Sequence, residues 1–302
     1  MRFDVSEMKT LAECSRKWEI SSRNAMHLKP RGINSNLAFG TLMHEALHAL
    51  YMGSDPEKVL EQALRELPDP VQKRVMENII TGYVAGPLKE DLEKYVVMDI
   101  EHAVHLKFPE IPDDEICGSI DMIVWEPTTN CIHGFEHKSA AKFRPQVYIA
   151  LDEQPRVYFM ALKQLVDDMN REALDEWAAL GKPADKEPVP YKVGNIYLNE
   201  VKKVQKKFEY QRTPCHYSDE VLAKFKQRLI ATAHKIHALQ EGTLEPCPEP
   251  SYMKCQMCDF ANICEMYQDR ELDEEALLEE FSEEFIKRDV DHLDEKVERR
   301  IK

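Results

Sequence analysis

The sequence predicts an α/β fold: a central mixed sheet flanked by helices, with a helical N-terminal lobe. Apolar residues recur at helical spacing through residues 5–95, and strand-like apolar runs follow from residue 96. A strongly amphipathic stretch at 219–241 then leads to a group of cysteines. With 302 residues, the chain is long enough to bury a large core without covalent cross-links.

The order of elements follows from these patterns. Asp55-Pro56 is typical of a helix start, with aspartate as the N-cap and proline in the first turn. Helices are expected at 6–20, 41–51, 55–66, 154–180, 219–241 and, with interruptions, 70–95. Strands are expected at 96–106, 116–125, 131–139 and 191–201, with a proline-bearing loop at 182–190.

We expect a single domain over residues 1–268. It would comprise a helical lobe (1–95), a catalytic core (96–210), and a helix with the cysteine group (211–268). Residues 269–302 are expected to form an acidic helical tail, because residues 265–302 hold fifteen acidic against seven basic side chains. Such a run is usually a solvated helix face, and the alternatives are a DNA mimic or a docking helix for a partner.

Two strand-like runs joined by the turn EPTTN carry the most informative side chains. If the turn is centred near Thr128–Thr129, Asp121 lies opposite Glu136, and Lys138 leaves its strand on the same face as Glu136. Two carboxylates this close repel each other unless a hard cation such as Mg²⁺ or Mn²⁺ lies between them. The alternative is a solvated strand face with a loose ion pair. Asp121 is, however, a lone acid in an apolar strand, where a charge is costly without a partner or a metal.

The eight cysteines form a second pattern. Cys255, Cys258 and Cys264 are close enough in sequence for three thiolates to bind one metal centre, and Cys14 is a candidate for the fourth ligand. Four thiolates suit a 4Fe–4S cluster and equally suit structural zinc, so spacing leaves both open. The other cysteines are expected to be buried small hydrophobic residues: Cys117, Cys131, Cys215 and Cys247.

The hairpin resembles the catalytic core of PD-(D/E)XK nucleases, in which an aspartate and an acid-x-lysine bind the catalytic metal. The resemblance implies that the central mixed sheet is restriction-endonuclease-like. His44 resembles the helix histidine of the RecB-like branch, and Gln154 and Tyr158 resemble its Q-x-x-x-Y motif. The resemblance implies catalytic roles for Asp121, Glu136, Lys138, Gln154 and Tyr158, and Mg²⁺ or Mn²⁺ ligands at His44, Asp121, Glu136, the backbone carbonyl of His137, and Glu101.

The cysteine pattern resembles that of AddB-type nuclease domains and CRISPR-associated adaptation exonucleases. The resemblance implies a 4Fe–4S cluster on Cys14, Cys255, Cys258 and Cys264 that joins the two chain ends, with Zn²⁺ as the alternative occupant. It also implies a DNA exonuclease acting on single strands or ends, in DNA repair, recombination, or phage or CRISPR DNA processing.

Two alternatives remain open at this point. One is a nuclease-fold DNA-binding or scaffold subunit; the chain has no G-x-x-x-x-G-K-[ST] motif, so a helicase or recombination partner would have to unwind DNA. The other is a zinc metalloprotease, because His44 and His48 form an H-E-x-x-H motif. The extended metzincin pattern fails at Tyr51, and we expect His48 to pack or to face solvent.

The net charge of −15 does not exclude DNA binding, which depends on local lysines and arginines. Candidate phosphate contacts are Arg16, Lys17, Lys142, Arg144, Lys202, Lys203, Lys206 and Lys207. No signal peptide or membrane span is visible, so we expect a protein of the bacterial cytoplasm, or a phage protein in its host's cytoplasm. A reducing compartment favours a metal centre over disulfides for the cysteines.

Overall fold

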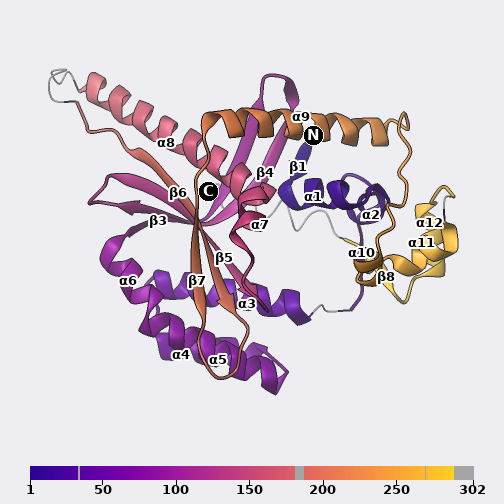
Figure 1. The fold of residues 1–302 in the computed structure, drawn as a ribbon, viewed down its shortest axis with the longest axis horizontal. Coiled ribbons are helices and arrows are strands. Elements are labelled where there is room, and N and C mark those ends of the chain that lie inside the picture. Colours follow the sequence, from indigo (N-terminus) through magenta and orange to yellow (C-terminus); the bar gives the residue numbers. More distant parts are fainter. Residues whose placement is uncertain (33–34, 181–186, 269, 289–302) are drawn as a thin grey trace. The chain divides into compact units, whose positions relative to one another are not determined.

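A computed structural model describes residues 1–32, 35–180, 187–268 and 270–288 (Figure 1). In chain order its elements are β1 (Arg2–Asp4), α1 (Val5–Glu13), α2 (Ser15–Ser21), β2 (Leu28–Pro30), α3 (Ser35–Tyr51), α4 (Pro56–Glu66), α5 (Pro70–Ala85), α6 (Pro87–Lys94), β3 (Val96–Phe108), β4 (Ile111–Glu126), β5 (Cys131–Ala140), α7 (Gln146–Leu151), α8 (Glu153–Ala179), β6 (Lys192–Lys202), β7 (Tyr210–Cys215), α9 (Asp219–Gln240), α10 (Tyr252–Gln256), α11 (Ala261–Tyr267), α12 (Glu274–Glu280) and β8 (Phe285–Lys287).

The larger sheet is mixed, as predicted. Its strands run in the order β1-β4-β5-β6-β7, and β3 also pairs with β4. The β4–β5 and β6–β7 pairs are antiparallel, whereas β1–β4 and β5–β6 are parallel. Strand β7 was not predicted; it contains Pro214, which a strand at the edge of a sheet tolerates because one side of its backbone needs no partner.

The chain forms two compact units, each built from separate segments. Unit 1 consists of described residues within 1–33, 105–117 and 223–302, and unit 2 of those within 34–104 and 118–222. The division that we expected at residues 95, 210 and 268 does not follow these units.

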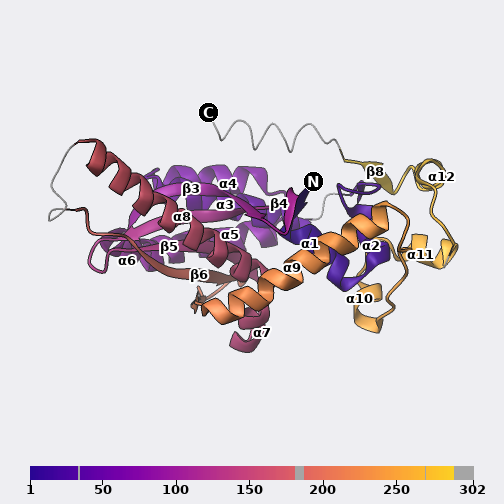
Figure 2. The ribbon, with the colours of Figure 1, turned by 90° about the horizontal axis from the view of Figure 1, so that it is seen from above.

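Unit 2 has three layers, with helices on both faces of the sheet (Figure 2). Apolar side chains of α3 and α5, among them Met43 and Ile79, share a core with Met122 and Phe135 of the central hairpin. On the other face, α8 packs against β5 and β6 through a buried stripe that includes Val157 and Leu162. This arrangement confirms the predicted sheet flanked by helices.

The ends of several helices follow from particular residues. In unit 2, Asp55 caps α4, accepting from the N–H groups of Glu57 and Lys58 as its sequence predicts. In unit 1, the helix expected at 6–20 is divided in two, because Cys14 has an extended backbone (φ −169°, ψ 119°). The break places this cysteine at the junction of α1 and α2.

A buried apolar cluster in unit 1 corrects the prediction that residues 269–302 form an acidic helical tail. Leu277 and Phe281 are buried in it together with Ile20 and Ile263. Phe285, expected on a helix, begins β8 instead, which pairs with β2 in antiparallel fashion. Helix α12 therefore ends at Glu280, and the remainder of the predicted tail at 289–302 lies outside the described residues. In the described part of the chain, we find no helix of the length and apolarity needed to cross a membrane.

Candidate active site

The hairpin of β4 and β5 has the predicted register. Met122 pairs with Phe135, which sets the preceding Asp121 across from Glu136. The N–H of His137 donates to the Asp121 carboxylate at 2.6 Å. The turn between the strands closes with an N–H of Thr129 on the Glu126 carbonyl at 3.3 Å.

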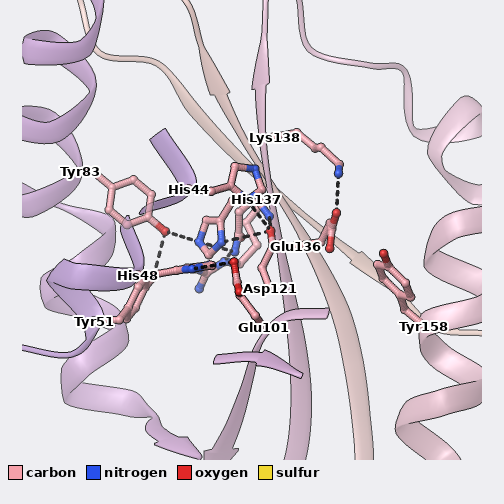
Figure 3. A network of polar contacts seen from close by, with 12 residues as sticks. His44, His48, Tyr51, Tyr83, Glu101, Asp121, Glu136, His137, Lys138 and Tyr158 are labelled. Atoms are coloured by element: carbon pink, nitrogen blue, oxygen red, sulfur yellow. Dashed lines mark hydrogen bonds and ion pairs between the residues drawn. The ribbon is translucent and has the colours of Figure 1, made fainter. Parts of the chain in front are cut away.

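Glu136 is the centre of the polar contacts on one side of β5 (Figure 3). Lys138 and the Gln154 amide both donate to its Oε1, the amide from 2.9 Å. Gln154 also donates to the Tyr158 hydroxyl at 2.9 Å. The other carboxylate oxygen of Glu136, Oε2, is buried and has no hydrogen-bond partner among the described residues. The site thus holds one buried oxygen that is ready to accept a further ligand.

The two carboxyl groups differ in their acidity. Burial raises the pKa of Glu136, the negative charge of Asp121 raises it further, and Lys138 opposes both effects. Burial would also raise the pKa of Asp121, but hydrogen bonds from His137 and His44 hold it below its usual range. A buried, unfavourable negative charge at Glu136 is the condition under which an added cation is most stabilising.

Two histidines of α3, His44 and His48, lie beside the Asp121 carboxylate. His44 Nδ1 lies 3.3 Å from Asp121 Oδ2, and ligand atoms of His44, His48 and Asp121 all lie within 4.8 Å of one another. From sequence, we expected His48 to pack or to face solvent, and placed it beside His44 as a ligand only in the H-E-x-x-H alternative. His48 Nδ1 in turn lies 3.9 Å from a carboxylate oxygen of Glu101.

Glu101 has an unusual backbone for a strand residue. Its φ of 53° lies in the left-handed region, which costs a non-glycine residue roughly 1–2 kcal/mol. The Glu101 carboxylate lies beside His48 (Figure 3).

The ring of His137 belongs to a buried network that sequence reasoning also missed. Tyr83 hydroxyl lies 3.1 Å from His137 Nε2 and 2.9 Å from the Tyr51 hydroxyl, which donates to Asp91 at 2.5 Å. Arg212 completes the network with two hydrogen bonds to Asp91, each of 2.6 Å. Because these partners come from α3, α5, α6 and β7, they fix the strand segment whose carbonyl we expected to bind metal.

The protease alternative does not fit this geometry. In an H-E-x-x-H protease the glutamate is the catalytic base beside the metal. Here Glu45 is exposed and lines a small cavity of about 80 Å³ with Gln62 and Glu66 of the neighbouring helix α4. The carboxylate beside His44 and His48 is Asp121.

The four cysteines singled out in the sequence line one cavity in unit 1. Its volume is about 440 Å³, and it is lined by Cys14 at the α1–α2 junction, Cys255 of α10, Cys258, and Cys264 of α11. Burial, as the largest cause, together with the neighbouring Cys14 and Cys258, raises the pKa of Cys264 to about 11. Among the described residues, no three of these sulfur atoms lie within 4.8 Å of one another.

The candidate phosphate contacts differ in their availability. Arg16 is 3 % exposed and binds Glu19 and the Arg270 carbonyl, which argues against a DNA contact there. Four other candidates are paired within the protein. Ion pairs join Lys17 to Glu13, Arg144 to Glu200 and Asp152, and Lys202 to Glu209, and a hydrogen bond joins Lys203 to Asn36. Exposed side chains are found at Lys142, Lys206 and Lys207.

Comparison with known proteins identifies the family. A family model described as the PD-(D/E)XK nuclease superfamily matches residues 2–265. The chain belongs to this superfamily.

Two solved structures resemble this chain at low sequence identity. A crystal structure of a candidate exonuclease from Eubacterium rectale matches with a TM-score of 0.52 at 12 % identity, over 89 % of this chain and 88 % of that one. The structure of SSO0001 matches with a TM-score of 0.39 at 12 % identity, over 87 % and 85 % of the two chains, which is too distant to carry an argument. No curated protein matches the sequence.

Proposed function

We propose that this nuclease is a metal-dependent exonuclease that hydrolyses phosphodiester bonds in single-stranded DNA or at DNA ends. The observation that carries the proposal is the buried, unpartnered Oε2 of Glu136 within the described residues, across the β4–β5 pair from Asp121, whose carboxylate lies with His44 and His48. Membership of the nuclease superfamily supports the same chemistry.

The donor set suits Mg²⁺ or Mn²⁺. Carboxylate oxygens of Asp121 and Glu136 are the ligands that hard divalent cations prefer, and imidazole is accepted by Mn²⁺. We assign the cation to these two carboxylates, His44 and the carbonyl of His137, and add His48 as a further ligand. A cation held there would lower the pKa of the attacking water and neutralise charge on the scissile phosphate.

Lys138, Gln154 and Tyr158 have separate roles in this proposal. The Lys138 side chain is 34 % exposed, so its ammonium group reaches solvent while it stays paired with Glu136, and it can orient a water molecule. Gln154 donates to Glu136 and to Tyr158 from one amide, which holds the carboxylate in a single orientation. Tyr158 is 5 % exposed and keeps its proton, because burial raises its pKa.

An assay with end-labelled linear single strands, linear duplexes and circular single strands tests this function. We expect Mn²⁺- or Mg²⁺-dependent release of labelled nucleotides from the linear single strand, no cutting of the circle, and loss of activity in EDTA. Glu136→Gln should bind the DNA and lose hydrolysis. Rapid cutting of circles would contradict exonuclease action, and binding without hydrolysis by the wild type would favour the scaffold alternative.

We further propose that Cys14, Cys255, Cys258 and Cys264 bind a 4Fe–4S cluster. The four cysteines line one cavity of unit 1, with a volume of about 440 Å³. Four thiolates are the ligand set of a 4Fe–4S cluster, and the same set would hold zinc as the alternative.

Anaerobic purification tests the cluster. We expect a brown protein with four irons per chain and broad absorption near 400 nm, as thiolate-ligated iron–sulfur clusters show. Cys258→Ser should lose the colour, while Cys131→Ser, a cysteine outside the cavity, should keep it. A colourless protein containing one zinc per chain would contradict the cluster.

We propose, finally, that exposed lysines contact the DNA backbone and that a helicase or recombination protein supplies single strands. Lys142, Lys206 and Lys207 are exposed cations of unit 2. Replacing all three with alanine should reduce the salt dependence of DNA binding, because fewer counterions are released. An unchanged salt slope would exclude them as phosphate contacts.

A further inference from the structure

Helix α7 presents an apolar face to solvent. Val147, Tyr148 and Leu151 are 69 %, 61 % and 64 % exposed. Their spacing places them on adjacent positions of one helix face, whereas Ile149 is 1 % exposed and anchors the opposite face. Three large apolar side chains exposed within one six-residue helix indicate a surface that binds something.

The helix is firmly held in unit 2. Arg144, just before it, binds Glu200 of β6 at 2.9 Å and Asp152 at 3.2 Å. Asp152 in turn caps α8 by accepting from the Gln154 N–H at 3.1 Å. Arg156 donates to the carbonyl of Ala150 at 2.9 Å. Because these contacts fix the backbone of α7, less conformational entropy is lost when a ligand binds to its exposed face.

The apolar face is close to the candidate active site. Leu151 precedes Gln154 by three residues, so their Cα atoms are at most about 11 Å apart. The Gln154 amide lies 2.9 Å from Glu136. A nucleic-acid strand with one phosphate at Glu136 therefore carries its neighbouring bases within reach of α7.

Charge identifies the occupant. The connection 139–151 between β5 and α8 contains no acidic residue, in a chain whose net charge is −15. Its Lys142 is exposed, whereas its Arg144 is paired with Glu200 and Asp152. An exposed aromatic ring and apolar neighbours beside local cations are the elements from which single-strand binding sites are built, because every base has a face that stacks. A duplex, whose bases are covered by each other, gains nothing from this face.

We propose that α7 is a base-stacking platform for single-stranded nucleic acid, with Tyr148 as the stacking residue and Val147 and Leu151 as its apolar border. The inference rests on the proposed nuclease function and specifies its substrate: the strand is bound by its unpaired bases as well as by its phosphates.

Binding without hydrolysis tests the platform. Fluorescent oligothymidine of about 15 nucleotides and an abasic strand of equal length are titrated in EDTA against wild type, Tyr148→Ala, Tyr148→Phe and Leu92→Ser. The control residue Leu92 is 52 % exposed on α6. We expect Tyr148→Ala to weaken oligothymidine binding about tenfold and to leave abasic binding unchanged, because one base–aromatic stack is lost. Tyr148→Phe and Leu92→Ser should match wild type.

Three results would overturn the platform. They are equal binding of oligothymidine and abasic strand by wild type, unchanged binding by Tyr148→Ala, and a self-association in sedimentation that Tyr148→Ala abolishes while DNA binding stays constant. The last would make α7 an interface between copies. Hydrolysis is measured separately with Mn²⁺, so base-dependent binding without cleavage would contradict the proposed function and leave the stacking platform standing.

Discussion

At the scale of single residues, the pairing of Asp121 with Glu136 could be predicted from sequence, whereas the residues that surround this pair could not. A five-residue turn fixes the register of two strands, so Asp121 and Glu136 could be set opposite each other from sequence. The contribution of His48 depends on how α3 packs across the sheet, which no local pattern contains. The same holds for the His137 ring, whose partners come from elements far apart in the chain.

Replacing His48 tests its assignment as a cation ligand. In His48→Ala, Mn²⁺ affinity measured by titration calorimetry should fall about tenfold or more, as is common when a group that holds a metal site is removed. His102→Ala is the control, because His102 is a half-buried histidine of the same unit that pairs with Asp99 at 2.7 Å. Equal Mn²⁺ affinity in wild type and His48→Ala would remove His48 from the ligand set.

At the scale of elements, long periodic segments were predicted well. The helix expected at 154–180 is α8, and the strand expected at 191–201 is β6, each displaced by about one residue. Helix α7 and strands β7 and β8 were missed, because six or fewer residues are too few for a periodic signal. Their existence depends on neighbours that complete their hydrogen bonds.

Gly82 tests how α5 holds the loop between β6 and β7. A Cβ at this position would overlap the ring of Phe208. Although alanine normally stabilises a helix interior by about 1 kcal/mol, we expect Gly82→Ala to lower the free energy of unfolding by about 1–3 kcal/mol, because the ring must move. In a Phe208→Ala background the same change should stabilise; destabilisation in both backgrounds would refute the overlap as the cause.

The environment of His133 predicts that the stability of the protein depends on pH. Its Nδ1 accepts from the Asn195 N–H at 3.0 Å, so its Nε2–H donates to Glu126 at 3.2 Å and the ring is neutral. Burial lowers the pKa of His133. The unfolded chain therefore binds this proton first as pH falls below about 6.5, and stability present above that pH is lost on acidification.

The comparison with His133→Gln isolates this effect in thermal unfolding. Between pH 7 and pH 5, wild type should lose about 1 kcal/mol more stability than the variant, the typical worth of one hydrogen bond. Parallel losses in the two proteins would show that His133 does not titrate in this range.

At the scale of the whole molecule, the fold class was predictable and the division into units was not. Helices before strands before a cysteine group suggested consecutive lobes. Unit 1 instead joins both ends of the chain, since β2 pairs with β8 and Ser15 hydrogen bonds to both the N–H and the carbonyl of Cys247. Contacts between residues more than 200 positions apart leave no trace in local periodicity, and only the cysteine pattern had implied that the two chain ends meet.

The most direct test of the central claim is the rate at which Lys138→Ala releases nucleotides from end-labelled single-stranded DNA in Mn²⁺. Lys163→Ala is the matched control, because the Lys163 side chain is 35 % exposed against 34 % for Lys138 and is likewise paired with an acid, Asp219. We predict that Lys138→Ala is slower than wild type by at least about 100-fold, since it lacks the group that positions the attacking water, and that Lys163→Ala is unchanged. A Lys138→Ala protein that digests DNA as fast as wild type would contradict the account.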